Sequence, residues 1–224
     1  MVSINEFLKK VFLGNVSIDD EYIESGYKEQ LSYLKKVWKD KTYGVERIVR
    51  LAICLIQFVY PTIFIRSIFG VLGARARKVA VEAYIVLKLL FPLIVLYTGL
   101  YQHMLVIAII IYLLTETIFH ILGLIFLSDL HPFSISYRRS ILLLFLHYLE
   151  VVFDFSVIYT AFDLLNKKLS PLSALYFSFV TNTTLGYGDI YPKSTSGQIA
   201  VIAQLIIFIM FVILFIDYFS SKSK

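Results

Sequence analysis

The residues best suited to chemistry in this chain are seven consecutive ones, 183–189, which read Thr-Thr-Leu-Gly-Tyr-Gly-Asp between two long apolar segments. Gly186 and Gly188 alternate with larger residues, and glycine tolerates backbone angles that are closed to other residues. Such alternation lets successive carbonyl groups point to one side. Rings of these carbonyl oxygens can replace the hydration shell of K⁺. The motif therefore predicts a backbone that binds cations rather than a reactive side chain.

The composition indicates a membrane protein. Apolar residues make up 58% of the 224 residues and charged residues 17%, whereas average soluble domains are about 45–50% apolar. Since one transmembrane helix takes about 20 residues, there is room for four or five. The net charge of +5 is concentrated in loops, which favours basic cytoplasmic flanks over nucleic-acid binding. Cys54 is the one cysteine, so no intrachain disulfide is expected.

The apolar residues fall into five segments, and each predicts a helix. They are residues 51–65, 81–98, 103–127, 139–161 and 197–219. The first is short, because 15 residues at about 1.5 Å each span about 22 Å of a ~30 Å hydrocarbon core. We expect it to lie in the interface and the N-terminus to be cytoplasmic; the alternative is that it spans, with the N-terminus outside. Residues 48–138 then form an N-terminal membrane region.

Residues 1–47 are polar and of mixed charge. Apolar side chains recur there at roughly helical spacing, at Tyr22, Ile23, Leu31, Leu34 and Trp38. The spacing predicts an amphipathic helix over 19–40 on the cytoplasmic membrane surface; a solvated arm is the alternative. At the other end, residues 220–224 are expected to be a short cytoplasmic tail.

The motif at 183–189 resembles the selectivity filter of the potassium channel family, whose common form is T-V/I/L-G-Y-G-D. The resemblance covers residues 139–219 and implies an all-α membrane protein with a tetrameric pore. The expected parts are an outer helix at 139–161, a re-entrant pore helix at 171–182, a filter at 184–188 and an inner helix at 197–219. Two or three further transmembrane or interfacial helices precede them. Ser170 and Pro171 suit the N-cap and the first position of the pore helix.

The resemblance also implies roles for single residues. The carbonyls that would coordinate K⁺, the permeant ion, belong to Thr184, Leu185, Gly186 and Tyr187, and Gly188 would close the outer turn. The residues that would support the filter are Thr183, Asp189, Tyr176, Phe177 and Phe179, with Asp189 hydrogen-bonded to Tyr176. No organic cofactor is expected. Because one chain carries one filter segment, four chains are needed, so a homotetramer is expected.

The distribution of basic residues supports this topology. If the filter loop enters from outside, the loops before 81 and before 139 are cytoplasmic. Their basic residues are Arg66, Arg75, Arg77, Lys78, Arg138 and Arg139. The loop at 99–102, which would be outside, carries no charge. This is the asymmetry that the positive-inside rule predicts.

The sequence says less about gating. No segment carries Arg or Lys at every third position, so a voltage sensor of the usual kind is not expected. The chain ends five residues after Phe219, and we expect no C-terminal ligand-binding domain. The inner helix has no central glycine or proline. The filter itself is therefore one candidate gate, and a hydrophobic constriction at Phe211 and Phe215 is another; the alternative for these two is helix packing.

Several ionisable residues lie inside the apolar segments, where charges are expensive and usually meet partners or water. They are Lys88, Glu116, His120, His147, Glu150 and Asp154. Spacings of three and four residues place some of them on shared helix faces. One interpretation is a polar network that passes a pH or voltage input to the outer pore helix. The alternatives are a structural network that fixes helix register, and a set of metal ligands.

These observations predict a multi-pass protein of the plasma membrane that conducts K⁺ passively across the lipid bilayer. The alternatives are a non-conducting or modulatory channel subunit and a less selective cation channel. An active transporter is disfavoured, because related transporters carry four degenerate filter segments in one chain. An enzyme is not expected, since neither a nucleophile–base set nor a phosphate-binding loop is visible.

Overall fold

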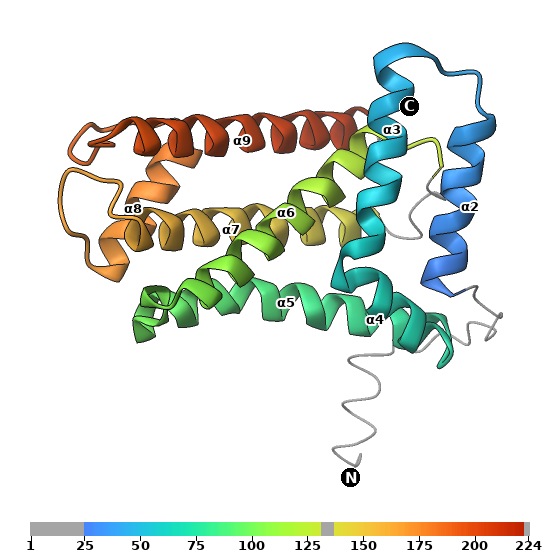
Figure 1. Cartoon of the computed structure of the whole chain (residues 1–224), viewed down its shortest axis with the longest axis horizontal. Coiled ribbons are helices and arrows are strands. Elements are labelled where there is room, and N and C mark those ends of the chain that lie inside the picture. Colours follow the sequence, from blue (N-terminus) through green and yellow to red (C-terminus); the bar gives the residue numbers. More distant parts are fainter. Residues whose placement is uncertain (1–24, 131–136, 222–224) are drawn as a thin grey trace, which may run out of the picture. The chain divides into compact units, whose positions relative to one another are not determined.

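The computed structural model describes residues 25–130 and 137–221 (Figure 1), and the regular structure in these ranges is helical apart from one isolated bridge between Leu165 and Pro192. The chain divides into two compact units, Met1–Tyr84 and Ile85–Lys224. Each is described by itself below. The predicted helix positions at Tyr22 and Ile23 lie outside the described residues.

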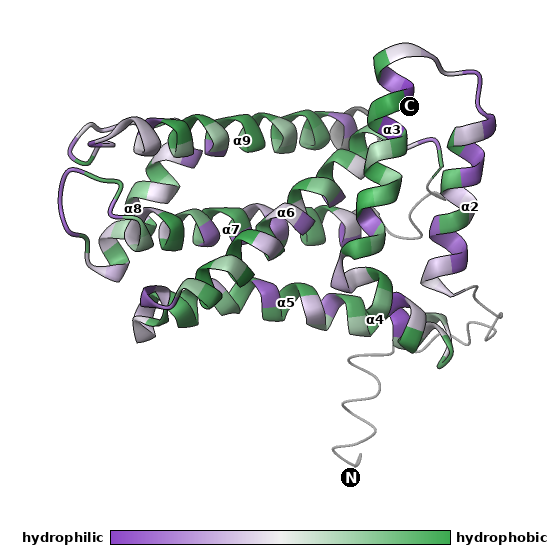
Figure 2. Cartoon of the chain, viewed as in Figure 1, coloured by the Kyte–Doolittle hydropathy of each residue, from purple (hydrophilic) through white to green (hydrophobic). Residues whose placement is uncertain are grey.

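Four helices of the described chain are long and apolar enough to cross a membrane. They are α5 (Ala74–Thr98), α6 (Met104–Phe126), α7 (Tyr137–Ala161) and α9 (Thr195–Ser221), and Figure 2 shows hydrophobic residues along most of their length. The chain is thus an all-α, multi-pass membrane protein, as predicted. Helix α5 begins seven residues earlier than expected, so Arg75, Arg77 and Lys78 lie on its first turns and not in a loop.

The segment predicted as one helix over 51–65 is a bent pair. Helix α3 (Gly44–Ile56) continues as a 3-10 turn, η1 (Gln57–Val59), and α4 (Pro61–Gly70) follows at an angle of 67°. The bend falls at Tyr60, which is extended (φ −86°, ψ 150°). A residue that precedes proline is excluded from the helical region by the proline ring, and Pro61 then starts the new helix at its first position. The pair is apolar enough to be a broken span or a re-entrant loop.

Helix α2 (Gly26–Lys39) is amphipathic, and the face that packs on the rest of the first unit is not the one that carries Leu31 and Trp38. Leu31 and Trp38 are exposed, whereas the buried side chains include Gln30, Tyr33 and Val37. Gln30 accounts for the difference. Its amide donates to the Cys54 carbonyl at 3.0 Å and to the Gln57 side chain at 2.9 Å, so a polar residue lies on the packed face. Hydrophobic spacing alone could not identify that face.

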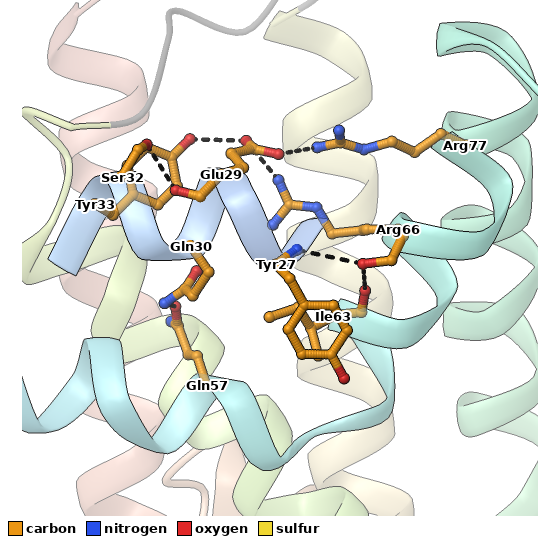
Figure 3. A network of polar contacts seen from close by, with 10 residues as sticks. Tyr27, Glu29, Gln30, Ser32, Tyr33, Gln57, Ile63, Arg66 and Arg77 are labelled. Carbon is orange, nitrogen blue, oxygen red and sulfur yellow. Dashed lines mark hydrogen bonds and ion pairs between the residues drawn. The ribbon is translucent and has the colours of Figure 1, made fainter. Parts of the chain in front are cut away.

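One carboxylate ties α2 to the helices that follow it in the first unit (Figure 3). Glu29 accepts from Arg66 at 2.7 Å, from the Tyr33 hydroxyl at 2.8 Å and from Arg77. Burial would raise the pKa of Glu29, but the two arginines and Tyr33 outweigh it and lower that pKa below 4.5. Burial, together with Glu29, raises the pKa of Tyr33 to about 12.

In the second unit, a short helix, α8 (Pro171–Asn182), lies between α7 and α9 at one end of both (Figure 1). A 3-10 turn, η2 (Leu100–Gln102), joins α5 to α6. The core between α6, α7, α8 and α9 contains large side chains such as Phe155, Tyr159, Phe177 and Phe211. This packing fixes α8 and the loop that follows it.

We expect α2 to detach at acid pH. The folded-state pKa of Glu29 is depressed, so its contribution is complete above 4.5 and is lost as the pH falls further. Trp38, the one tryptophan of the chain, lies on α2, and its fluorescence anisotropy should fall below pH 4.5. Glu29→Gln should show low anisotropy already at neutral pH and no acid step. In the control Glu46→Gln, which removes an exposed carboxylate, the acid step should persist; an unchanged step in Glu29→Gln would contradict the assignment.

Candidate functional site

The helix before the filter motif has the predicted bounds, Pro171–Asn182. The Ser170 side chain caps it by accepting from the Ser173 amide at 3.2 Å, and Pro171 occupies its first turn. Both features confirm the expected start signals. With 12 residues, or about 18 Å at 1.5 Å each, α8 is too short to cross a ~30 Å hydrocarbon core. It is a re-entrant element, held by its neighbours.

A buried polar cluster holds α8 against α7 and α9. The Ser178 hydroxyl donates to the Val152 carbonyl of α7 at 2.6 Å. From α9, the Gln204 amide donates to the Ser178 hydroxyl at 2.9 Å and to its carbonyl at 3.1 Å. The Tyr159 hydroxyl donates to Gln204 at 2.7 Å. This cluster was not predicted from the sequence, in which Gln204, a polar residue in an apolar helix, was its one signal.

The backbone after α8 alternates between two conformations. Thr184, Gly186 and Gly188 have positive φ angles of 58°, 57° and 80°, while Leu185 and Tyr187 between them do not. Gly186 and Gly188 are therefore required by the backbone, not by crowding, since a Cβ on either would meet no atom within 4 Å. Such alternation is compatible with the predicted row of carbonyl groups that turn toward one side.

Thr184 is unusual in this row because it is β-branched. A residue of that kind at positive φ is an outlier whose strain costs about 1–3 kcal/mol and persists only when its surroundings fix it. Here the Thr184 amide donates to the Thr181 carbonyl at 3.0 Å, and the Leu185 amide to the Val180 carbonyl at 3.0 Å. The Thr183 hydroxyl donates to the Phe179 carbonyl at 2.8 Å. The end of α8 thus imposes the strained conformation.

The side chains of the filter residues point away from the core of the single chain. Leu185 is 61% exposed and Tyr187 67% exposed. The Tyr187 ring stacks on Tyr176 of α8, with parallel planes and centroids 6.4 Å apart. Desolvation and the charge of the Asp189 carboxylate raise the pKa of the Tyr176 hydroxyl. Asp189 thus lies near Tyr176, its expected partner.

The remaining supporting aromatics also pack as a group. Phe177 meets Tyr159 edge to face at 4.9 Å, and Phe179 meets Phe153 at 6.0 Å. These contacts join α8 to α7. After the predicted filter, the segment that leads into α9 is paired with the residues that follow α7. Lys193 donates its amide to the Leu164 carbonyl at 3.0 Å and its ammonium group to Asp163. Both ends of the filter loop are thus fixed.

On the inner helix α9, the two predicted gate residues do not lie on the exposed face. Phe211 is buried and packs edge to face against Tyr148 of α7, with centroids 5.7 Å apart. Phe215 is partly buried against the same core. Their positions match the packing alternative. The exposed face carries isoleucines instead, in alternate steps of three and four residues: Ile199, Ile202, Ile206, Ile209, Ile213 and Ile216.

A second polar cluster, within α5, α6 and α7, brings the predicted intramembrane residues together. Lys88 pairs with Glu116 at 3.2 Å and with Glu150 at 3.0 Å. It also donates to the Thr117 hydroxyl at 2.7 Å, which in turn donates to Glu150 at 2.8 Å. Thr117 was missed by the sequence analysis because threonine is common in apolar helices. All four of these side chains are buried.

The other three predicted members border this cluster. His147 Nδ1 lies 2.9 Å from the second oxygen of Glu150, and the His120 ring lies 5.2 Å from the His147 ring. Asp154, one turn beyond Glu150, is buried, and no described residue hydrogen-bonds its Oδ2. Within the described ranges no three His, Cys, Asp or Glu side chains are placed to hold a metal ion. The metal-ligand alternative is therefore not supported.

Comparisons with known proteins agree with this geometry. Residues 144–223 match a family model described as "Ion channel". A segment of 41 residues is 39% identical to the potassium channel protein kcv of Paramecium bursaria Chlorella virus 1. The matched segment makes up 18% of this chain and 44% of that protein. The chain thus matches less than half the length of this curated relative. No solved structure matches significantly.

Residues 144–223, which are similar to the ion-channel family model, contain the short helix held between two apolar helices and the alternating backbone that follows it. The similarity to the chlorella virus protein, over 41 residues, is a similarity to a potassium channel, which agrees with the resemblance of the motif. Both matches indicate a channel or transporter rather than an enzyme.

We expect Gln204→Leu to destabilise the channel domain. It leaves the Tyr159 hydroxyl without an acceptor and Ser178 with fewer donors in a buried site, and an unsatisfied buried group costs about 1–3 kcal/mol. The free energy of unfolding, measured by SDS titration in mixed micelles, should fall by about that amount. Gln198→Leu, on the exposed face of the same helix, is the matched control. Equal loss in both variants would contradict the role of the cluster.

Proposed function

We propose that the chain forms a homotetrameric channel that conducts K⁺ selectively and passively. The observation that carries this proposal is the alternation of positive φ at Thr184, Gly186 and Gly188. Four copies of such a row around an axis would present rings of carbonyl oxygens to a dehydrated ion. The coordinating carbonyls would be those of Thr184, Leu185, Gly186 and Tyr187. The strain held at Thr184 supports a functional role, because the backbone would relax if it served only as a turn.

The isoleucine repeat of α9 supports the assembly. Steps of three and four residues give a period of 3.5, which keeps one seam of a helix facing its partners. Isoleucine at both positions of the repeat favours assemblies of three or four helices over two. We propose that a second copy of this chain covers the seam, and that the wall of the inner pore is largely isoleucine. A dewetting constriction would then lie on this face and not at Phe211.

The proposed orientation follows from charge. Arg75, Arg77 and Lys78 on the first turns of α5, and Arg138 and Arg139 at the start of α7, would be cytoplasmic by the positive-inside rule. The filter would then face the outside of a plasma membrane. The partial negative charge at the C-terminal end of α8 would favour a cation in the inner cavity.

We expect Gly186→Ala to abolish most K⁺ flux. An added Cβ at a φ of +57° is strained by about 1–2 kcal/mol, which reduces the population of the filter conformation about 5- to 30-fold. The measurement is flux from proteoliposomes with a K⁺ gradient, with Na⁺ substitution and Ba²⁺ block as tests of selectivity.

Gly99→Ala is the matched control for this experiment. It imposes similar backbone strain at φ +76°, in the α5–α6 connection, and should leave flux unchanged. Equal Na⁺ and K⁺ flux in the unmodified protein would indicate a less selective cation channel. Absence of flux under all conditions would indicate a non-conducting subunit, and either result would overturn the proposal.

Cysteine cross-linking should reveal the proposed seam. Cys54 is the one native cysteine, so single cysteines can be placed in a Cys54→Ala background at Ile206, Ile209, Ile213 or Ile216. Under mild oxidation at least one of these positions should give disulfide-linked dimers on denaturing gels. Phe211→Cys, on the buried face, is the control and should not. Cross-linking at Phe211 alone would place the contact on the wrong face of α9.

A further inference from the structure

The charged cluster of α5, α6 and α7 contains more acid than base. Lys88 contributes the permanent positive charge of the cluster, whereas Glu116, Glu150 and Asp154 are three carboxyls, all buried. If every carboxyl were ionised and the histidines neutral, the cluster would carry two uncompensated negative charges. Such charge is too costly in a hydrocarbon layer. The cluster therefore needs to hold protons in addition to that of Lys88.

The places where a proton can reside are defined by the hydrogen bonds. Glu150 is satisfied on both oxygens: Lys88 and Thr117 bond one, and His147 bonds the other. Asp154 is different, because it is 1% exposed, its Oδ2 has no hydrogen-bond partner among the described residues, and the charges of Glu150 and Lys88 act on it. The structure thus offers two sites, the Asp154 carboxyl and the His147 ring.

We propose that this cluster is an intramembrane proton-binding site whose occupancy controls the pore; the control of the pore rests on the proposed channel function. A proton on Asp154 or His147 changes the net charge that Lys88 has to balance. This change in net charge alters the strength of the ion pairs that Lys88 makes with Glu116 of α6 and Glu150 of α7. Protonation of histidine clusters is a known way to switch the packing of proteins, and the same kind of switch is proposed here.

A contiguous set of contacts leads from this site to the filter. Asp154 lies two residues beyond Val152, whose carbonyl accepts the Ser178 hydroxyl of α8 at 2.6 Å. Ser178 in turn receives the Gln204 amide of α9. A small movement of α7 therefore reaches both the helix that ends at the filter and the helix with the isoleucine seam. The element that moves is α7, and both the proton site and the pore helix contact it.

Charged and titratable groups lie on each of the three helices that form the site. On α5 there is Glu82, six residues before Lys88; on α6, Glu116 and His120; on α7, Arg139 near its start. Helix α8 contacts α7 through Ser178, and Gln204 of α9 contacts Ser178. Neither of these two side chains titrates. The proton would thus bind among α5, α6 and α7, and the helices that respond by changing the pore would be α8 and α9.

The test combines two measurements on the intact protein in proteoliposomes. Infrared difference spectra between acid and neutral pH report carboxyl protonation without requiring flux. K⁺ flux across the same pH steps, between about pH 5 and pH 8, reports the pore. If the open and closed states differ tenfold in proton affinity, the open-to-closed ratio changes about tenfold over the titration.

Asp154→Asn is the first variant, because its Oδ2 has no partner to lose and the shape is kept. It should remove a protonated-carboxyl band and flatten the pH dependence of flux. His147→Gln should shift the flux transition, and Ser178→Ala should leave the band in place but reduce the flux response. Glu46→Gln, an exposed carboxylate of α3, should change neither.

Each other outcome counts against the proposal. A titrating band with flux that does not depend on pH would overturn the control of the pore. A pH-dependent flux that survives in Asp154→Asn, His147→Gln and Glu150→Gln would overturn the site. If the unmodified protein conducts at no pH, the proposed channel function fails, and the control of the pore fails with it; the infrared band then still decides whether the cluster binds a proton.

Discussion

The demand that polar groups be satisfied without water governs the second unit of this protein. A pore helix of 12 residues enters the membrane and turns back, so its ends cannot rely on solvent. Gln204, inside a helix that is otherwise apolar, meets this demand. Its amide and carbonyl complete the bonds of Ser178 and Tyr159, so one side chain joins three helices. The position of α8, and with it the geometry of the loop that follows, depends on these hydrogen bonds.

The first unit follows the same principle at a smaller scale. Glu29 satisfies two arginines from later parts of the chain and also a tyrosine. The polar contacts of this one carboxylate thus add to the packing of Tyr33 and Val37, which also holds α2. In both units polar side chains fix the positions of helices, while the apolar surface stays available to lipid or to other chains.

Much of the channel domain could be predicted because its signals are local. The start of α8 depends on Ser170 and Pro171, and the alternation of backbone angles depends on Gly186 and Gly188, which are readable in any context. The intramembrane charges could also be grouped, since helical spacing and depth place them together. The pairing of individual oxygens with individual donors could not be predicted from the sequence. Thr117 could not be assigned to the cluster either, because the pattern of an apolar helix does not show which of its faces is packed.

Packing decided the remaining features. The exposed and buried faces of α2 and α9 differ from the expectation because Gln30 lies inside and Phe211 contacts Tyr148. The bend at Tyr60 was readable in principle from Pro61, but the apolar run around it suggested continuity. Where a helix is apolar on all sides, as α9 is, its sequence pattern alone does not identify the face that packs.

The length of α9 has a mechanical consequence. Its apolar part, Thr195–Asp217, has 23 residues and is about 34 Å long, longer than a ~30 Å hydrocarbon core. No glycine or proline follows Gly197 in this helix, so it accommodates the mismatch as a rigid rod, by tilting roughly 30° or by thickening the lipid around it. A thicker bilayer would reduce the tilt of α9 from the membrane normal, and a thinner bilayer would increase it. In the proposed tetramer, the width of the inner vestibule would therefore depend on the thickness of the surrounding membrane.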